Sequence, residues 1–178
     1  MTRQFESHNL LAGKRGVIFG VVDQASLAWF IARQCVSEGA QIVLTNTPQA
    51  IQLGQAAQLA EQLNVPLIAC DASQVADLTT LFQQAQSQLG GKIDFVLHAV
   101  ALSQNLRRHK GYTDLNYSYY NTTLDVSAIS LHKLLQVCMQ MDALSEGASV
   151  VTLSYIASSR FMDGYGDMSD AKALLESI

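Results

Sequence analysis

The sequence lacks the features that mark membrane, secreted and nucleic-acid-binding proteins. No apolar run reaches the roughly 20 residues that span a bilayer, and residues 1–9 contain no apolar core of a signal peptide. Acidic side chains outnumber basic ones by 15 to 11, so the net charge of −4 offers no basic surface to nucleic acid or anionic lipid. We therefore expect a cytoplasmic protein that binds neither nucleic acid nor membrane.

Cysteine and histidine are scarce, and their spacing matches no metal site. The three cysteines, Cys35, Cys70 and Cys138, are far apart, odd in number and embedded in apolar segments. They form no Cys-x-x-Cys pair, and the four histidines show no ligand spacing either. We expect reduced core cysteines, with no disulfide framework and no metal.

Apolar residues, by contrast, are plentiful: 49% of the 178 residues are hydrophobic and 15% are charged. Short apolar runs alternate five times with stretches of helical apolar spacing. Because strands of near-continuous apolar character are buried on both faces, this pattern predicts an α/β fold with a doubly wound parallel sheet in a three-layer α/β/α arrangement. The predicted strands are residues 13–20, 41–46, 65–69, 93–100 and 149–154. The predicted helices are residues 26–38, 48–63, 73–89 and 121–141, with a last helix from about Asp163.

No repeat, low-complexity tract or linker interrupts this alternation, so residues 1–178 are expected to form a single domain. Gly39 is a suitable helix stop, Pro48 suits a first helical turn, and Ser73 is the expected cap of the third helix. Residues 101–120 are expected to be irregular.

The loops at the carboxyl ends of the strands are where such a sheet binds ligands. The first loop runs from Gly20 to Ser26, where the next helix offers free N–H groups and a positive dipole end to a phosphate. Since the loop has no Gly-x-Gly-x-x-Gly pattern, an ordinary strand–helix turn is the alternative. Asp71, after the third strand, either accepts hydrogen bonds from an adenine or caps the helix near Ser73; both readings stay open.

Tyr165 and Lys172 are seven residues apart, which on a helix is close to two turns and places both side chains on one face. A phenol can hydrogen-bond or protonate a developing oxyanion, and a nearby ammonium lowers the phenol's pKa and can bind a cofactor's hydroxyls. The pair therefore suits a reduction site. Two residues on a solvated helix face have the same spacing by chance.

Three motifs together resemble the short-chain dehydrogenase/reductase superfamily, and within it the bacterial enoyl-acyl carrier protein reductase branch. The loop from Gly20 to Ala28 is similar to the branch's Gly-x5-Ser-Ile-Ala loop, and Leu153-Ser154-Tyr155 is similar to its first tyrosine motif. The third motif is Tyr165-x6-Lys172, where the wider superfamily has Tyr-x3-Lys. The resemblance covers residues 13–178 and implies a Rossmann-like dinucleotide-binding fold.

The resemblance implies reduction of the trans-2 double bond of an enoyl thioester on acyl carrier protein, in the last step of the fatty-acid elongation cycle. It also implies a homotetramer. A carbonyl or alcohol oxidoreductase and a non-catalytic dinucleotide-binding module are the alternatives.

Where relatives have His-Ser-Ile-Gly, this chain has His98-Ala99-Val100-Ala101, and Ala101 narrows the space near the nicotinamide. His98 is interpreted as a packed strand-end residue rather than a catalyst. Relatives continue past residue 178, so the C-terminal strands and substrate lid of the family fold are expected to lie outside this sequence.

Site residues follow from the resemblance position by position. The catalytic residues are Tyr165, which bonds the thioester carbonyl, Tyr155, which lines the acyl pocket, and Lys172, which also bonds the nicotinamide ribose. Ser103 is expected beside the substrate. The remaining cofactor contacts are Gly20, Ser26 and Leu27 at the pyrophosphate, Thr47 near the adenosine ribose, Asp71 and Ala72 at the adenine, and Val100 at a ribose.

Charged residues bear on two further predictions, the choice between NADH and NADPH and the docking of a carrier protein. The segment Asn46-Thr47-Pro48-Gln49 has neither the acidic residue that favours NADH nor the basic one that favours NADPH. The absence of Arg and Lys favours NADH, with NADPH as the alternative. The basic run at residues 107–110 is either a solvated loop or a docking patch for an acidic acyl carrier protein.

Overall fold

A computed structural model describes residues 7–178 and contains one five-stranded sheet. The strand order is β3-β2-β1-β4-β5, and every neighbouring pair is parallel, which confirms the predicted doubly wound architecture. Residues 1–6, most of the segment searched for a signal peptide, lie outside the described residues. The strands are β1 Arg15–Phe19, β2 Gln41–Asn46, β3 Leu67–Ala69, β4 Ile93–His98 and β5 Leu144–Thr152.

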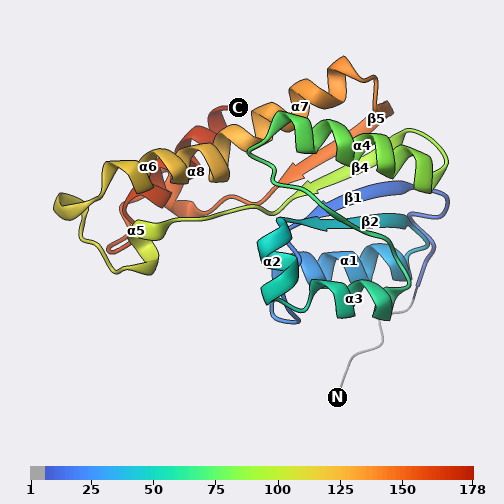
Figure 1. The fold of residues 1–178 in the computed structure, drawn as a ribbon, viewed down its shortest axis with the longest axis horizontal. Coiled ribbons are helices and arrows are strands. Elements are labelled where there is room, and N and C mark those ends of the chain that lie inside the picture. The colour runs from blue at the N-terminus through green and yellow to red at the C-terminus, as the bar shows by residue number, and fades with distance from the viewer. Residues whose placement is uncertain (1–6) are drawn as a thin grey trace.

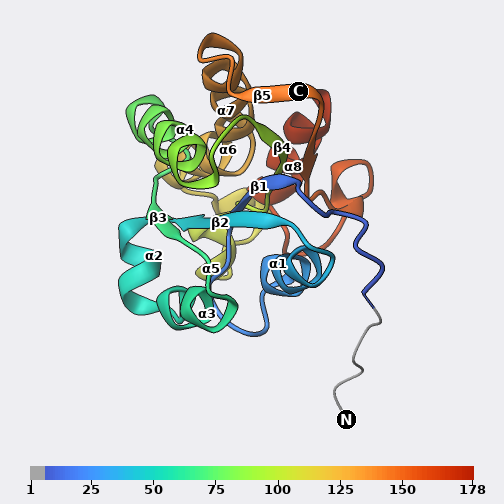
Figure 2. The same ribbon diagram turned by 90° about the vertical axis from the view of Figure 1, so that its right-hand side faces the viewer.

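Helices cover both faces of the sheet, as the three-layer prediction required (Figure 1). The end-on view in Figure 2 shows α1, α2 and α3 on one side and α4 and α7 on the other. Within residues 7–178, no helix has both the length and the apolar character needed to cross a bilayer. The α-helices are α1 Leu27–Ser37, α2 Pro48–Leu53, α3 Ala56–Leu63, α4 Val75–Leu89, α5 Gln104–Arg107, α6 Tyr117–Leu124, α7 Ser130–Gln140 and α8 Asp167–Ser177.

The strands form because their apolar side chains serve two cores at once. In β1, Val17 and Phe19 enter the core beneath α4 and α7, whereas Ile18 enters the core beneath α1 and α3, and each is at most 1% exposed. Each such burial stabilises the fold by about 1.5–3 kcal/mol. The three cysteines carry free thiols: Cys70 and Cys138 lie in the first core, and Cys35 packs against the second.

The predicted helix over residues 48–63 is wrong, because it divides at Gly54 into α2 and α3. Gly54 adopts extended backbone, and the N–H of Gln55 donates to the carbonyl of Val22, in the loop after β1. This tertiary bond takes the place of a continuous helix. Ser73 does not cap α4 either, since Gln74 holds that position and the Ser73 hydroxyl donates to Asp71 instead.

Residues 101–120 are more ordered than predicted. They contain α5, a 3₁₀ turn at Tyr112–Asp114 and the start of α6, whose cap is Asn116 with its side chain accepting from the N–H of Tyr119. The predicted helix over residues 121–141 therefore begins at Tyr117. It also contains one π-helical turn, η2 Asp125–Ile129, before continuing as α7.

Two boundaries near the last strand also differ from the prediction. β5 begins at Leu144 rather than Ser149, with an irregular register opposite the start of β4. α8 begins at Asp167 rather than Asp163, because Gly164 and Gly166 both have positive φ and interrupt the helical path.

One part of the molecule lies beyond the carboxyl ends of β4 and β5, to the left in Figure 1. We call it the distal segment and define it as residues 101–129 and 155–178. Within it, α8 packs against α6, against η2 and against the 3₁₀ turn η3 Ile156–Ser158. The distal segment therefore meets the sheet at the edge where ligands are expected.

Candidate functional site

The site begins where β1 and β4 end side by side, at the point where the strand order reverses. Gly20 follows β1 with φ +94°, and a Cβ on it would lie 2.0 Å from the carbonyl oxygen of Ala99, which follows β4. No other residue fits here without moving one of the two loops. In a doubly wound sheet, this reversal point is the crevice that binds a dinucleotide.

The loop from Gly20 to Ser26 leaves the start of α1 open. The Ser26 hydroxyl donates to the carbonyl of Asp23 at 2.6 Å, so it braces the loop rather than the helix. The first turn of α1 contains no acidic side chain, and Leu27 is 67% exposed. The unpaired N–H groups at this helix start are therefore available to an anion, as the predicted phosphate site requires.

The loop after β2 is tied to the loop after β1 by Asn46, which was not among the predicted site residues. Its Nδ2 donates to the carbonyl of Val21 at 3.0 Å, and its Oδ1 accepts from the N–H of Thr47 at 2.8 Å. The Thr47 hydroxyl in turn accepts from the N–H of Ala50 and caps α2. Thr47 thus lies at the carboxyl end of β2, where a ribose contact was predicted.

Asp71 forms a turn ahead of α4. Its Oδ1 accepts from both the N–H and the hydroxyl of Ser73, at 2.9 and 2.7 Å. It does not cap α4 itself, so that alternative is wrong, and Oδ2 has no donor among residues 7–178. Ala72 is buried in the same core against which Val100 packs, so the predicted adenine and ribose residues share one side of the sheet.

Tyr165 and Lys172 come together by a route other than the predicted one. Tyr165 precedes α8, so the argument that both lie on one helical face is wrong. Instead, the chain after β5 joins them: Lys172 Nζ donates to the carbonyl of Leu153 at 2.7 Å, and the rings of Tyr155 and Tyr165 pack with centroids 5.0 Å apart. The structure therefore gathers the three predicted catalytic residues beside the end of β5.

Burial controls the ionisation of these groups. Burial raises the pKa of Tyr165, and the neighbouring Tyr155 adds to the effect, so the expectation that Lys172 lowers it is wrong. Burial also lowers the pKa of Lys172, which is 6% exposed. A tyrosine with a raised pKa keeps its proton at neutral pH and can donate it to an oxyanion.

The family follows from a comparison with known sequences. Residues 20–178 match a family model described as enoyl-(acyl carrier protein) reductase. The chain belongs to this family. Its Rossmann-like fold, already evident from the sheet order, agrees with that membership.

Individual relatives support the assignment. The chain is 34% identical to enoyl-[acyl-carrier-protein] reductase [NADH] 1 of Rhizobium meliloti, over 96% of this chain and 62% of that protein. A crystal structure of FabI from Alistipes finegoldii has 48% identity and a TM-score of 0.93, over 96% of this chain and 66% of the other. The FabI–NADH complex from the same organism has 49% identity and a TM-score of 0.93, over 96% and 60%. The chain thus spans less than two thirds of the Rhizobium relative.

His98 is the packed strand-end histidine that was predicted, at 1% exposure. Its Nε2 lies 2.8 Å from the hydroxyl of Ser130, which itself donates to the carbonyl of Val126. Its Nδ1 lies 3.1 Å from the hydroxyl of Thr152, which also lies 3.2 Å from the backbone carbonyl of His98, so both ring nitrogens have a hydroxyl partner. Burial, aided by the positive charge of Lys172, lowers the pKa of His98 to about 4.

Ser103 forms its hydrogen bonds within the protein. It is buried, donates to Asp167 Oδ1 at 2.7 Å and accepts from the N–H of Leu106 at 2.9 Å, so the geometry gives no support to the predicted substrate contact. Asn105 and Thr123 also donate to Asp167. We call these four residues the Asp167 cluster. An acidic residue in the first turn of a helix is common, so nothing in the sequence distinguished Asp167.

Proposed function

We propose that the protein is an NADH-dependent enoyl-[acyl-carrier-protein] reductase. The observation that carries the proposal is the packing of Tyr165 against Tyr155, with ring centroids 5.0 Å apart, where the chain after β5 also holds the buried ammonium of Lys172 through its bond to Leu153. These groups follow the last strand of a sheet whose β1–β4 crevice suits a dinucleotide. The name of the Rhizobium relative, which specifies the substrate carrier and NADH, supports the same activity.

The residues of the sheet edge fit NADH. Gly20 lets the loops after β1 and β4 approach each other closely at the crevice, and the acid-free start of α1 suits a pyrophosphate. Residues 46–49 contain no cation for a 2′-phosphate, and a FabI from Alistipes finegoldii was solved with NADH. The residues that would hold the cofactor are Gly20, Ser26, Leu27, Thr47, Asp71, Ala72, Val100 and Lys172. When bound, NADH supplies the hydride that adds to the β-carbon of the enoyl thioester.

The protein's part in the reaction is to stabilise charge on the thioester oxygen as that hydride adds. Tyr165 retains its proton because burial raises its pKa, so its hydroxyl donates a hydrogen bond to the developing enolate. Such preorganised donors usually supply the largest share of catalysis. Tyr155, 42% exposed and packed at a tilt against Tyr165, would line the acyl pocket.

Lys172 has a second role. An ammonium has three N–H donors, and the bond to Leu153 uses one of them. The two others are available to the ribose hydroxyls next to the nicotinamide. The positive charge also lies in a buried setting, where it favours a neighbouring oxyanion more strongly than it would in water.

The test is whether the full-length protein converts a trans-2-enoyl thioester and NADH into the saturated thioester, followed by nicotinamide absorbance and product mass. Lys172→Ala should lower kcat by at least about 100-fold, whereas Lys92→Ala, at an exposed lysine paired with Asp142, should leave kcat unchanged. NADH binding by the wild-type protein without turnover would instead indicate a non-catalytic module.

The acyl carrier protein is proposed to dock at the basic run at the end of α5. Arg107 and Arg108 are exposed, the latter with its guanidinium 5.3 Å from the ring of Tyr119, and Lys110 pairs with Asp114. Replacing both arginines by Glu should raise KM for carrier-linked substrate but not for a coenzyme A analogue. An equal change in KM for both substrates would indicate that the basic run is a solvated loop and not a docking patch.

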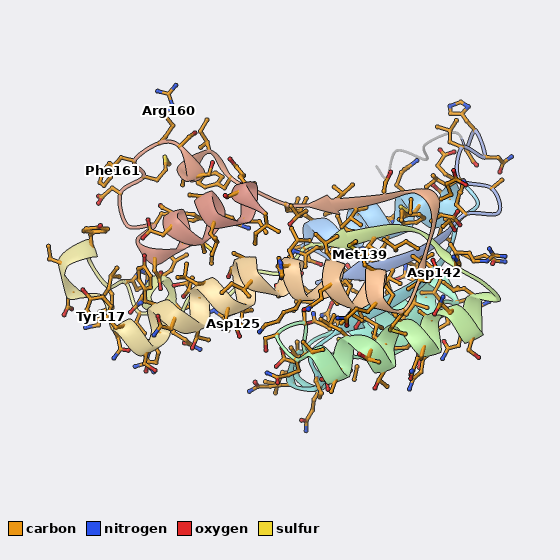
Figure 3. All side chains as sticks on the ribbon, turned by 90° about the horizontal axis from the view of Figure 1, so that it is seen from above. Tyr117, Asp125, Met139, Asp142, Arg160 and Phe161 are labelled. Atoms are coloured by element: carbon orange, nitrogen blue, oxygen red, sulfur yellow. The ribbon has the colours of Figure 1, made fainter. Side chains whose placement is uncertain are left out.

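The homotetramer and the cytoplasmic location implied by the resemblance also remain proposals. In support of self-association, the continuous helix formed by α6, η2 and α7 exposes Tyr117 and Met139, at 78% and 79% (Figure 3). Contiguous exposed apolar patches often mark protein interfaces. Sedimentation of the wild-type protein and a Met139→Glu variant would test this surface.

A further inference from the structure

A carboxylate outside the proposed catalytic residues is completely buried. Asp167 is 0% exposed and accepts three side-chain hydrogen bonds. Its Oδ1 accepts from Ser103 Oγ at 2.7 Å, and its Oδ2 accepts from Asn105 Nδ2 and Thr123 Oγ1, both at 2.8 Å. Ser103, Asn105 and Thr123 are themselves at most 4% exposed.

This carboxylate has no cationic partner among the ion pairs of residues 7–178. Neutral donors therefore replace the water that it loses, assisted by its place in the first turn of α8, at the positive end of the helix dipole. A buried charge is costly wherever its hydrogen bonds are incomplete. The three donors are consequently held where the carboxylate requires them.

The cluster joins the two sides of the proposed site. Ser103 and Asn105 belong to the chain after β4, shortly after Val100, whereas Asp167 lies between Tyr165 and Lys172. Asn105 also connects the cluster to the residue before α6, because its Nδ2 donates to the carbonyl of Asn116 and its Oδ1 accepts from the N–H of Asn116.

A second clamp holds the same chain. The hydroxyl of Ser127, in the π-helical turn, accepts from the N–H of Leu102 at 2.9 Å and lies 3.2 Å from the carbonyl of the same residue. The segment from Leu102 to Asn105 is thus fixed by Ser127 from η2 and Asp167 from α8, and Thr123 from α6 bonds the same Asp167 carboxylate.

We propose that Asp167 is a positioning residue: through the Asp167 cluster, it fixes Tyr165 and α8 against the chain that carries Val100, and so sets the thioester side of the site relative to the cofactor side. This inference rests on the proposed reductase function. It requires Asp167 to touch neither substrate nor cofactor, which agrees with its complete burial. Misplacement of a reacting group by about 1 Å can cost about 100-fold in rate.

The deciding variant is Asp167→Asn, which keeps the shape of the side chain but turns one acceptor oxygen toward its donors as an NH₂. Asp170→Asn is the matched control, because Asp170 lies on the same helix but is exposed and accepts a single side-chain bond, from Tyr120 at 2.7 Å. We expect Asp167→Asn to lower kcat about 100-fold while the Kd for NADH changes by less than about threefold, and Asp170→Asn to change neither.

Hydrogen exchange of the full-length variants gives a readout that does not need turnover. Asp167→Asn should speed exchange in residues 101–108 and 162–170 and leave the strands unchanged. Should Asp167→Asn not fold, Thr123→Val removes one donor and Thr123→Ser retains it; the former should lower kcat and the latter should restore it. Undiminished kcat in Asp167→Asn, or equal losses in Asp167→Asn and Asp170→Asn, would overturn the inference.

A wild-type protein without turnover would refute the proposed function. The exchange contrast between Asp167→Asn and Asp170→Asn would then still decide whether the cluster fixes the two segments. The two failures are therefore distinguishable.

Discussion

The sheet and the distal segment are held together by different forces. The sheet lies between two continuous apolar cores, and β1 contributes to both. The apolar core that involves α8 has three buried members, Ala128, Leu131 and Leu175, whereas polar clusters tie the helices of the distal segment to the chain after β4. Apolar contacts have no preferred direction, so the cores can stabilise the sheet while a cofactor lies along its edge. Hydrogen bonds are directional, so they can hold the reacting hydroxyl of Tyr165 in one position. The predictions below test this contrast, from the largest expected effect to the smallest.

Gly20→Ala should be the most damaging single change in the sheet half. The new Cβ would meet the Ala99 carbonyl in a backbone conformation with φ +94°, so we expect a loss of about 4 kcal/mol in the free energy of unfolding. Gly90→Ala is the control, because Gly90 has φ +74° but open space around its Cβ position, and should cost about 1 kcal/mol. Urea denaturation measures both. Equal losses would show that backbone strain, and not the contact between loops, decides the cost.

His98 should make the protein sensitive to acid. Its pKa in the folded state is about 4 against an ordinary 6.5, so below pH 6.5 the unfolded chain takes up a proton that the buried ring, facing Lys172, does not. The free energy of unfolding should therefore be unaffected by His98 above pH 6.5 and fall by about 3 kcal/mol as the pH drops to about 4.

His98→Gln should remove that part of the acid dependence. His132→Gln, at an exposed histidine on α7, should leave it unchanged. Denaturation curves at a series of pH values provide the measurement. An identical acid dependence in the wild-type protein and His98→Gln would contradict the account.

Ser127→Ala should weaken the distal segment at the π-helical turn. It removes the acceptor for the partly buried N–H of Leu102, and leaving such a donor unsatisfied costs about 1–2 kcal/mol. Ser118→Ala, at an exposed serine of α6, should cost less than about 0.5 kcal/mol. Thermal denaturation compares the two variants. A Ser127→Ala protein as stable as Ser118→Ala would show that the hydrogen bond between Ser127 and Leu102 does not stabilise the distal segment.

Lys133→Met should have the smallest effect. Lys133 Nζ donates to Asp125 Oδ1 at 2.6 Å and to the carbonyl of Ser73 at 2.8 Å, and so links η2 to the turn before α4. Because the pair is partly exposed, we expect a loss of about 0.5–1 kcal/mol that shrinks with added salt. Lys92→Met, which breaks the exposed pair with Asp142, should cost close to nothing. A loss that does not respond to salt would point to packing of the lysine stem instead.

The same contrast explains what could be read from the sequence. The strands were predictable because Val17, Ile18 and Phe19 form a short apolar run, a local pattern that burial on two faces produces. The start of α6 was missed, since Tyr117 begins a run of tyrosine, asparagine and threonine with weak helix propensity, which its packing against α8 overrides.

The site was predicted in part. Resemblance pointed to Tyr155, Tyr165 and Lys172, which the structure brings together and whose roles remain a proposal, although the helical argument for the pair was wrong because the helix begins after Tyr165. The Asp167 cluster was out of reach, since its bonds to Ser103 and Asn105 join positions 64 and 62 residues apart. Hydrogen bonds over such separations leave no periodic pattern in a sequence.

The measurement that most directly tests the account compares NADH affinity and turnover in Tyr165→Phe. If Tyr165 acts on the thioester while the loops at the sheet edge and Lys172 hold the cofactor, the Kd for NADH should stay within about threefold of the wild-type value. The kcat for a trans-2-enoyl thioester should fall by at least about 100-fold. Undiminished turnover, or a parallel loss of NADH affinity and turnover, would contradict this division of roles.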